Sequence, residues 1–187
     1  MRVRIFIAVL AILAAGCTDP EAARRLEADI ERVNERIKQA QEELKTYSKG
    51  SVVNDLIALR MAIQEQTLAM LEQRRAAQQW RTTLIYTVDG KPYAAPADLP
   101  ARVATLQGRL KNAREARESD LQLMRGSADS VRSLYVTSIA TKTVQIAQLE
   151  YQLAAHTNGF PAYYVPVRAP AKDGAPQAPA GKTATAR

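Results

Sequence analysis

The fold class is decided by residues 26–47, which read LEADIERVNERIKQAQEELKTY. Apolar residues recur there at alternating steps of four and three, with mostly charged or polar residues between them. This heptad spacing is typical of a helix that packs along a narrow strip on another helix. The apolar positions are Leu26, Ile30, Val33, Ile37, Ala40, Leu44 and Tyr47. The pattern predicts an all-α, coiled-coil-like body.

Local signals set the ends of this first helix, which we predict over about residues 20–48. Asp19 suits a helix cap, and Pro20 suits the first helical position. Gly50 and Ser51 suit the end of one helix and the start of the next. We therefore expect the chain to break or kink at Gly50.

A second apolar strip predicts a helix over about residues 52–86. Gln66 and Gln73 interrupt the strip, so its face suits a bundle or a loose hairpin better than a strict two-stranded rod. We expect Met70 and Trp80 to fill the core. The apolar members of the strip are Leu56, Leu59, Ile63, Met70, Ala77, Trp80 and Leu84.

A third long helix is predicted over about residues 100–157, with a possible break at Gly126. Its expected end is marked by Gly159 as a cap and by Pro161 just beyond. Its apolar strip is Val103, Leu106, Leu110, Ala113, Leu121, Met124, Val131, Leu134, Ile139, Ile146, Leu149 and Leu153. The predicted helical domain, residues 17–161, is therefore an elongated antiparallel coiled-coil hairpin or a three-helix bundle.

The connection between the second and third helices contains the one β-like stretch of the chain. Asp89 and Gly90 lie between apolar flanks, as in a tight hairpin turn, so we expect a turn or a tiny ribbon. Tyr86, Asp89, Gly90 and Tyr93 form the candidate interaction loop, although a plain connector is the ordinary alternative. Residues 162–187 begin with an extended segment and become rich in Pro and Ala, which predicts a disordered tail.

The N-terminal segment has the layout of a secretory signal over residues 1–16. Arg2 and Arg4 precede an apolar run from Ile5 to Ala15. A membrane-spanning anchor is the alternative, but it needs about 20 apolar residues to cross the hydrocarbon. The run has eleven residues, which favours the signal.

The end of this segment, Leu13-Ala14-Ala15-Gly16-Cys17, resembles the lipobox of bacterial lipoproteins, although leucine usually stands where this chain has Ala14. The resemblance implies cleavage before Cys17 by signal peptidase II and lipid attachment to Cys17. It also implies a membrane partner, because two kinds of acyl attachment hold a protein on a bilayer. Thr18 follows the cysteine instead of the Asp that retains such proteins in the inner membrane. This points to the periplasmic face of the outer membrane.

Composition argues against most chemical functions. The formal charge is +7, but Arg2 and Arg4 contribute two of these charges and residues 162–187 contribute three. The remaining +2 is spread over a mixed surface, so we expect no nucleic-acid partner. One His and one Cys provide no metal cluster, and no catalytic, nucleotide-binding or cofactor-binding motif occurs. We expect neither an enzyme nor a cofactor.

A lipid tether combined with helical surfaces predicts a structural scaffold or accessory subunit of an envelope assembly. The rival hypothesis is a periplasmic carrier or chaperone that binds unfolded polypeptide or lipid on its apolar helix faces. Aromatic residues make up only 5% of the chain, so narrow helical strips bury little surface alone. We therefore also expect a homo-oligomer.

Overall fold

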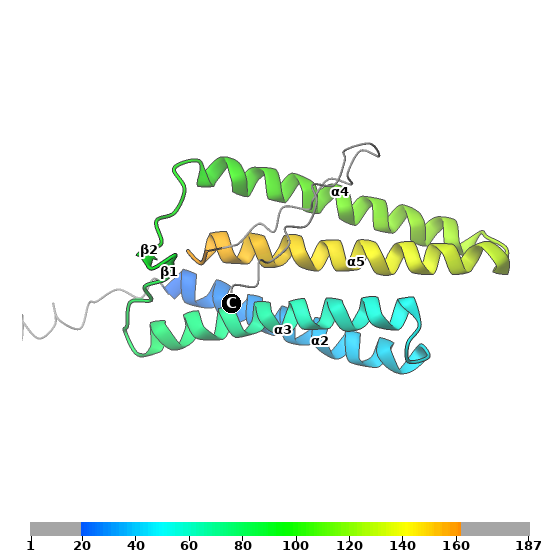
Figure 1. Ribbon diagram of the computed structural model, residues 1–187, viewed down its shortest axis with the longest axis horizontal. Coiled ribbons are helices and arrows are strands. Elements are labelled where there is room, and N and C mark those ends of the chain that lie inside the picture. Colours follow the sequence, from blue (N-terminus) through cyan, green and yellow to red (C-terminus); the bar gives the residue numbers. More distant parts are fainter. Residues whose placement is uncertain (1–19, 162–187) are drawn as a thin grey trace, which may run out of the picture.

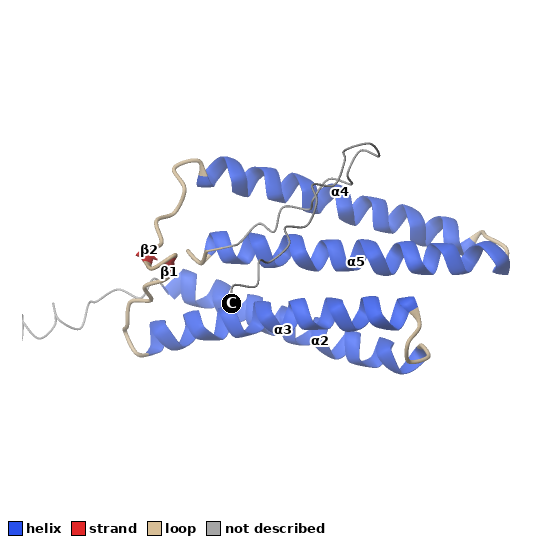
Figure 2. Cartoon of the chain, in the orientation of Figure 1, coloured by secondary structure: helices blue, strands red, loops and turns tan. Residues whose placement is uncertain are grey.

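The computed structural model describes residues 20–161, which form four long helices and one short ribbon (Figures 1 and 2). In chain order the elements are α2 (Pro20–Thr46), α3 (Val52–Gln79), β1 (Thr87–Val88), β2 (Lys91–Pro92), α4 (Leu99–Arg125) and α5 (Asp129–Thr157). The all-α prediction is confirmed. Cys17, the predicted signal segment and the predicted Pro/Ala-rich tail lie outside the described residues.

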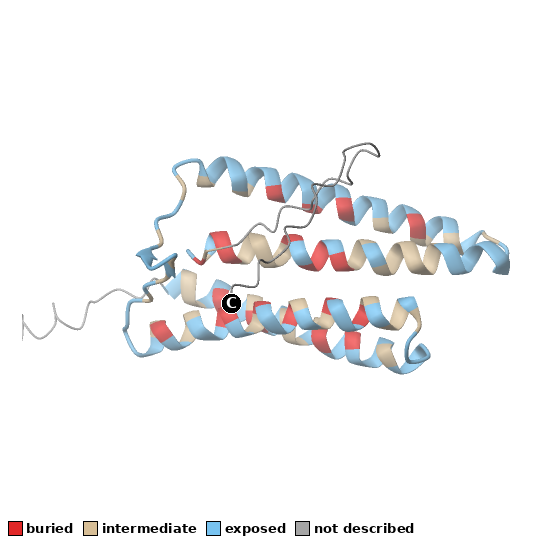
Figure 3. Ribbon diagram, viewed as in Figure 1, coloured by how far each residue is buried: buried red, intermediate tan, exposed pale blue. Residues whose placement is uncertain are grey.

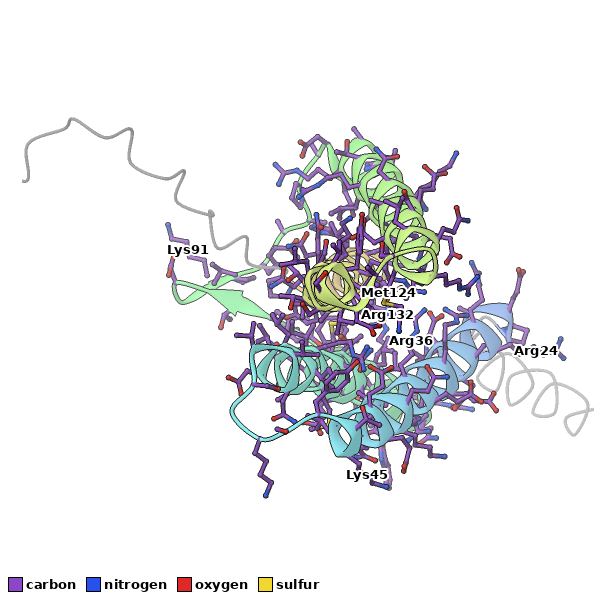
Figure 4. The ribbon with its side chains drawn as sticks, turned by 90° about the vertical axis from the view of Figure 1, so that its right-hand side faces the viewer. Arg24, Arg36, Lys45, Lys91, Met124 and Arg132 are labelled. Atoms are coloured by element: carbon purple, nitrogen blue, oxygen red, sulfur yellow. The ribbon has the colours of Figure 1, made fainter. Side chains whose placement is uncertain are left out.

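The helices form two antiparallel hairpins, α2 with α3 and α4 with α5, which pack together through α3 and α5. Each helix has 27 to 29 residues and is about 40 Å long, so the bundle is elongated. Seen along its length, α2 and α4 lie on the same side of the α3–α5 pair (Figure 4). The α2 and α4 helices do not pack against each other.

The possible break at Gly126 is confirmed: the predicted third helix, residues 100–157, is two helices, and the chain reverses direction after Gly126. The Gly126 N–H and the Ser127 hydroxyl both donate to the Leu123 carbonyl oxygen, at 3.2 and 2.7 Å. These bonds satisfy a carbonyl that the end of a helix leaves without an internal partner. The described part of the chain is thus an all-α bundle, in which the break at Gly126 turns the three predicted helices into four.

The first helix follows its prediction. It ends at Thr46, within two residues of the expected end, and Gly50 adopts φ +79° where the chain turns. The Ser51 hydroxyl then caps α3 by accepting a hydrogen bond from the Asn54 N–H at 3.2 Å. The buried members of the α2 strip are Leu26, Ile30, Ile37 and Ala40.

The second helix ends at Gln79, seven residues before the predicted end. Arg81 adopts φ +52°, and the Thr82 N–H donates to the Ala77 carbonyl oxygen at 2.9 Å. The Arg81 N–H donates to the Gln78 carbonyl oxygen at 3.2 Å. This pair of bonds is a Schellman motif, with arginine in the left-handed position that glycine usually occupies. The sequence offered no glycine there to indicate a stop.

The buried face of α3 also differs from the predicted strip. Leu59 is 48% exposed and Trp80 is 79% exposed, so Trp80 is not core filler. The α3 helix packs against both α2 and α5, and its buried face must therefore serve two neighbours. The residues buried on α3 are Ile57, Arg60, Gln64, Thr67, Met70, Leu71 and Ala77.

Two apolar clusters hold the bundle together, and the buried residues follow the inward strips of the helices (Figure 3). One cluster joins α2, α3 and the end of α5 through Leu26, Ile30, Met70, Leu71, Ala155 and Phe160. The other joins α4 to α5 through Leu106, Leu110, Ala113, Ile146 and Leu149. Toward its turn the α4–α5 hairpin extends past the α2–α3 turn (Figure 1). Val131 and Leu134, predicted on the apolar strip, are therefore 42% and 70% exposed.

The predicted ribbon is present as the pair β1 and β2. Asp89 and Gly90 adopt φ +51° and +73°, as a type I′ hairpin turn requires. Tyr86 extends the ribbon by accepting a hydrogen bond from the Tyr93 N–H at 2.7 Å. The Tyr86 ring packs on the Phe160 ring with centroids 4.6 Å apart. This contact fixes the ribbon against the C-terminal end of α5, where Gly159 forms the expected cap.

Candidate partner-binding groove

A groove runs along the bundle between α2 and α4, with α3 and α5 as its floor. It consists of three recesses of about 200, 540 and 230 Å³. The first and second share the lining residues Arg36, Gln64, Arg114, Ala147 and Glu150. The second and third share Glu43, Arg60 and Thr143, so the three recesses form one continuous groove. We call this feature the α2–α4 groove.

A carboxylate on the floor links the two walls of the α2–α4 groove. Glu150 on α5 accepts a hydrogen bond from Arg114 on α4 at 2.7 Å, and its other oxygen accepts one from Arg36 on α2. The Glu150 side chain is 17% exposed, so these contacts are partly shielded from solvent. Figure 4 shows Arg36 between α2 and α4. Glu150 therefore sets the spacing of two helices that have no direct packing contact.

The middle of the groove floor is polar and buried. Arg60 on α3 donates to Glu43 on α2 at 2.8 Å. Arg60 and Gln64 are each only 8% exposed. Arg60 Nε and Gln64 Oε1 have no hydrogen-bond partner among the described residues. Unsatisfied polar atoms at such depth are uncommon and cost about 1–3 kcal/mol each.

The third recess, nearest the α2–α3 turn, is mostly apolar. Its apolar lining consists of Tyr47, Val53, Leu56, Ile57, Leu121, Met124, Val136, Ile139 and Ala140. Next to it Lys142 and Ser138 on α5 donate to Asp120 on α4, at 2.5 and 2.6 Å. The Lys142 and Ser138 hydrogen bonds hold the pKa of Asp120 below its usual range. The α4–α5 hairpin is thus held together beside an apolar recess.

The predicted interaction loop lies at the end of the bundle opposite the third recess, and its residues line none of the three recesses. Asp89 and Gly90 are exposed at the tip of the ribbon, whereas Tyr86 and Tyr93 are half-buried. The Tyr86 hydroxyl is buried, and burial raises the pKa of Tyr86. Tyr86 therefore packs the ribbon onto the bundle, and of the four predicted loop residues only Asp89 and Gly90 are exposed.

Sequence reasoning missed the α2–α4 groove, because its residues come from all four helices. Spacing along the chain alone would pair Lys111 with Glu115 and Arg114 with Glu118, each four residues apart. Lys111 does approach Glu115 at 3.9 Å, but Arg114 pairs with Glu150 across the interface instead of with Glu118. The one available signal was that polar Gln64 and Arg60 share a helical face with Ile57 and Leu71.

His156 lies in the last turn of α5, where a histidine commonly caps a helix end, but here it is buried. It is 5% exposed, and the Asn158 side-chain amide donates to the Ala154 carbonyl oxygen instead, at 2.8 Å. Burial, with a smaller contribution from the positive charge of Arg102, lowers the pKa of His156.

Within residues 20–161, no three His, Cys, Asp or Glu side chains are grouped so that they could hold a metal ion. Over the same residues, none of the helices combines the length and apolar character that crossing a membrane demands. Compared with models of known protein families, with curated proteins and with solved structures, the chain shows no match.

Proposed function

We propose that the chain is a lipid-anchored envelope protein that acts as a structural scaffold or accessory subunit, with a partner protein seated in the α2–α4 groove. A lipid on Cys17 holds it at the periplasmic face of the outer membrane. The groove is the observation that carries the proposal. It is continuous, and it lies between two helices that a closed bundle would pack together.

The polar floor supports a protein partner over a purely apolar ligand. Gln64 lines the first recess, and the last torsion of its side chain has a broad range of accessible angles. Rotation about this torsion can therefore turn the Gln64 amide toward the groove. A backbone N–H or a polar side chain of the partner then satisfies Gln64 Oε1, and a carbonyl or carboxylate satisfies Arg60 Nε. Binding in this position relieves the cost of burying these atoms without partners.

Isolation of the complex tests the groove directly. Full-length protein with a C-terminal tag is purified from membranes in mild detergent, and bound proteins are identified by mass spectrometry. Arg117 lines the groove on α4, whereas Arg109 is exposed on the same helix and lines none of the three recesses. We expect Arg117→Glu to lose a stoichiometric envelope partner and Arg109→Glu to retain it. If both variants retain the partner equally, the partner does not bind in the α2–α4 groove.

The anchor is tested on the same preparation. Mass spectrometry of the N-terminal peptide is expected to show a diacylglyceryl group on the Cys17 thiol and an acyl group on its amine. An unmodified Cys17 would contradict lipid anchoring.

The apolar third recess favours a second candidate function, a carrier or chaperone for unfolded polypeptide or lipid. Heterogeneous co-purifying clients, together with a rise in melting temperature when a client is added, would support this function. Failure to bind any client would exclude it. One stoichiometric partner on an acylated protein would instead support the scaffold.

We also propose that the chain self-associates. Leu123, Val131 and Leu134 are exposed near the α4–α5 turn, where a second copy can cover them. Sedimentation equilibrium is expected to show a dimer or larger species. A monomer alone at high micromolar concentration would contradict self-association.

A further inference from the structure

The end of the bundle opposite the α4–α5 turn displays two large apolar side chains. Trp80 is 79% exposed and Ile85 is 75% exposed. Both lie in the connection between α3 and β1, beside the ribbon (Figure 1). Neither lines any recess of the α2–α4 groove. Their exposure is therefore unrelated to the proposed partner site.

The backbone at Trp80 is firmly held. Trp80 is the C-cap of α3, and its N–H donates to the Ala76 carbonyl oxygen at 2.9 Å. The next residue, Arg81, is kept in the left-handed conformation by the Schellman motif. A non-glycine residue in that conformation is strained, and such strain is found where the surroundings impose a backbone geometry. The fold thus fixes the base of the Trp80 side chain at this end of the bundle.

This end is also where the described chain begins. The N-terminal end of α2, at Pro20, lies at the same end of the bundle as the C-terminal end of α3 and the ribbon (Figure 1). Cys17 is three residues before Pro20 in the sequence. Three residues span at most about 11 Å, which is far less than the length of the bundle. A lipid on Cys17 would consequently place the bilayer surface at the end of the bundle that carries Trp80 and Ile85, and Figure 4 shows the start of α2, at Arg24, and the ribbon, at Lys91, on opposite sides of that end.

The charged residues beside these two side chains suit a phospholipid surface. Arg81 and Lys91 are exposed there, with Asp89 as the opposing charge on the ribbon. Figure 4 shows Lys91 projecting from the ribbon, away from the helices. Basic side chains pair with lipid phosphates, while tryptophan is enriched at the membrane interface because its ring is apolar and its N–H is polar.

We infer that Trp80 and Ile85 insert into the interfacial layer of the bilayer that holds the lipid on Cys17. This inference rests on the proposed lipid anchor. The anchor alone leaves the bundle free to tilt, whereas a second, apolar contact at the same end holds the bundle axis upright on the bilayer surface. The α4–α5 turn then points away from the bilayer by about the 40 Å length of a helix.

Trp80 is the only tryptophan of the chain, so its fluorescence reports on this contact alone. Full-length acylated protein is reconstituted into vesicles of phosphatidylcholine brominated in its acyl chains, with unbrominated vesicles as reference. We expect brominated lipid to quench the Trp80 emission. We also expect the emission of the vesicle-bound protein to be blue-shifted relative to that of protein without its lipid anchor in detergent-free buffer. Unchanged emission in protein that floats with the vesicles would overturn the inference and leave the anchor intact.

The matched control moves the single tryptophan to the other end. The variant Trp80→Phe with Leu134→Trp changes two exposed positions, and its fold is checked by circular dichroism and thermal melting. We expect its emission to be insensitive to bromine. Quenching at both positions would show a bundle lying flat and would overturn the end-on orientation. If the acylated protein does not float with vesicles, the proposed anchor and this inference fail together.

Discussion

Arg36 and Arg114 lie on helices that have no packing contact, yet both bind the carboxylate of Glu150. Without Glu150 the two guanidinium groups would lose the carboxylate that both of them bind. We predict that Glu150→Ala lowers the free energy of unfolding by about 1–2 kcal/mol, because the side chain is partly shielded. Urea denaturation measures this loss.

The matched control for Glu150 is Glu115, which lines the second recess but is largely exposed and approaches Lys111 on the same helix at 3.9 Å. Glu115→Ala should cost at most about 0.5 kcal/mol, as exposed pairs usually do. Equal losses for the two variants would show that the shared carboxylate does not hold α2 and α4 in place.

The buried face of α3 is tested by a pair of leucines. Leu71 is 1% exposed, whereas Leu59, on the strip expected from the sequence, is 48% exposed. Leu71→Ala should cost about 2–5 kcal/mol because it opens a cavity in the core. Leu59→Ala should cost less than about 1 kcal/mol. If chemical denaturation shows a larger loss of unfolding free energy for Leu59→Ala than for Leu71→Ala, the apolar strip predicted from the sequence is the buried face.

Strain at Arg81 predicts a stabilising substitution. With φ +52°, Arg81 holds a conformation that glycine adopts without steric cost. Arg81→Gly is expected to raise the free energy of unfolding by about 0.5–1 kcal/mol, and Arg81→Ala is not. If thermal melting shows no difference between the glycine and alanine variants, the backbone at this position is not strained.

Burial of His156 predicts a pH-dependent stability. Its pKa is lowered in the folded protein, so the unfolded chain binds more protons as the pH falls below about 6.5. Stability should therefore be fully present above about pH 7 and decrease as the pH falls below about 6.5, the ordinary pKa of histidine. Thermal melting across this range should show the decrease in the native protein, whereas His156→Gln should lack most of it. A melting temperature that rises on acidification would contradict a buried, neutral His156.

The elements that follow from local rules could be predicted from the sequence. Heptad spacing located α2 and its buried strip, and Gly50, Gly126 and Gly159 marked the ends of three helices. The Asp89-Gly90 pair indicated the ribbon. Each of these depends on a few neighbouring residues with a special backbone conformation or a regular period.

The features set by packing between distant segments could not be predicted. The end of α3 depends on a non-glycine residue, Arg81, in a conformation that glycine usually adopts. The buried face of α3 depends on its having two neighbours, which places Gln64 in the core and leaves Leu59 exposed. The α2–α4 groove depends on which pairs of helices pack, and no short motif contains that information.

Site-specific photo-crosslinking in intact cells can capture a partner protein that occupies the α2–α4 groove. A photoreactive amino acid replaces Gln39, which lines the second recess, or Gln41, which is exposed on the same helix and lines none of the three recesses. We predict that position 39 gives one discrete crosslinked partner and that position 41 gives none. Equal crosslinking at both positions, or no crosslink at position 39, would contradict occupation of the groove by a partner protein.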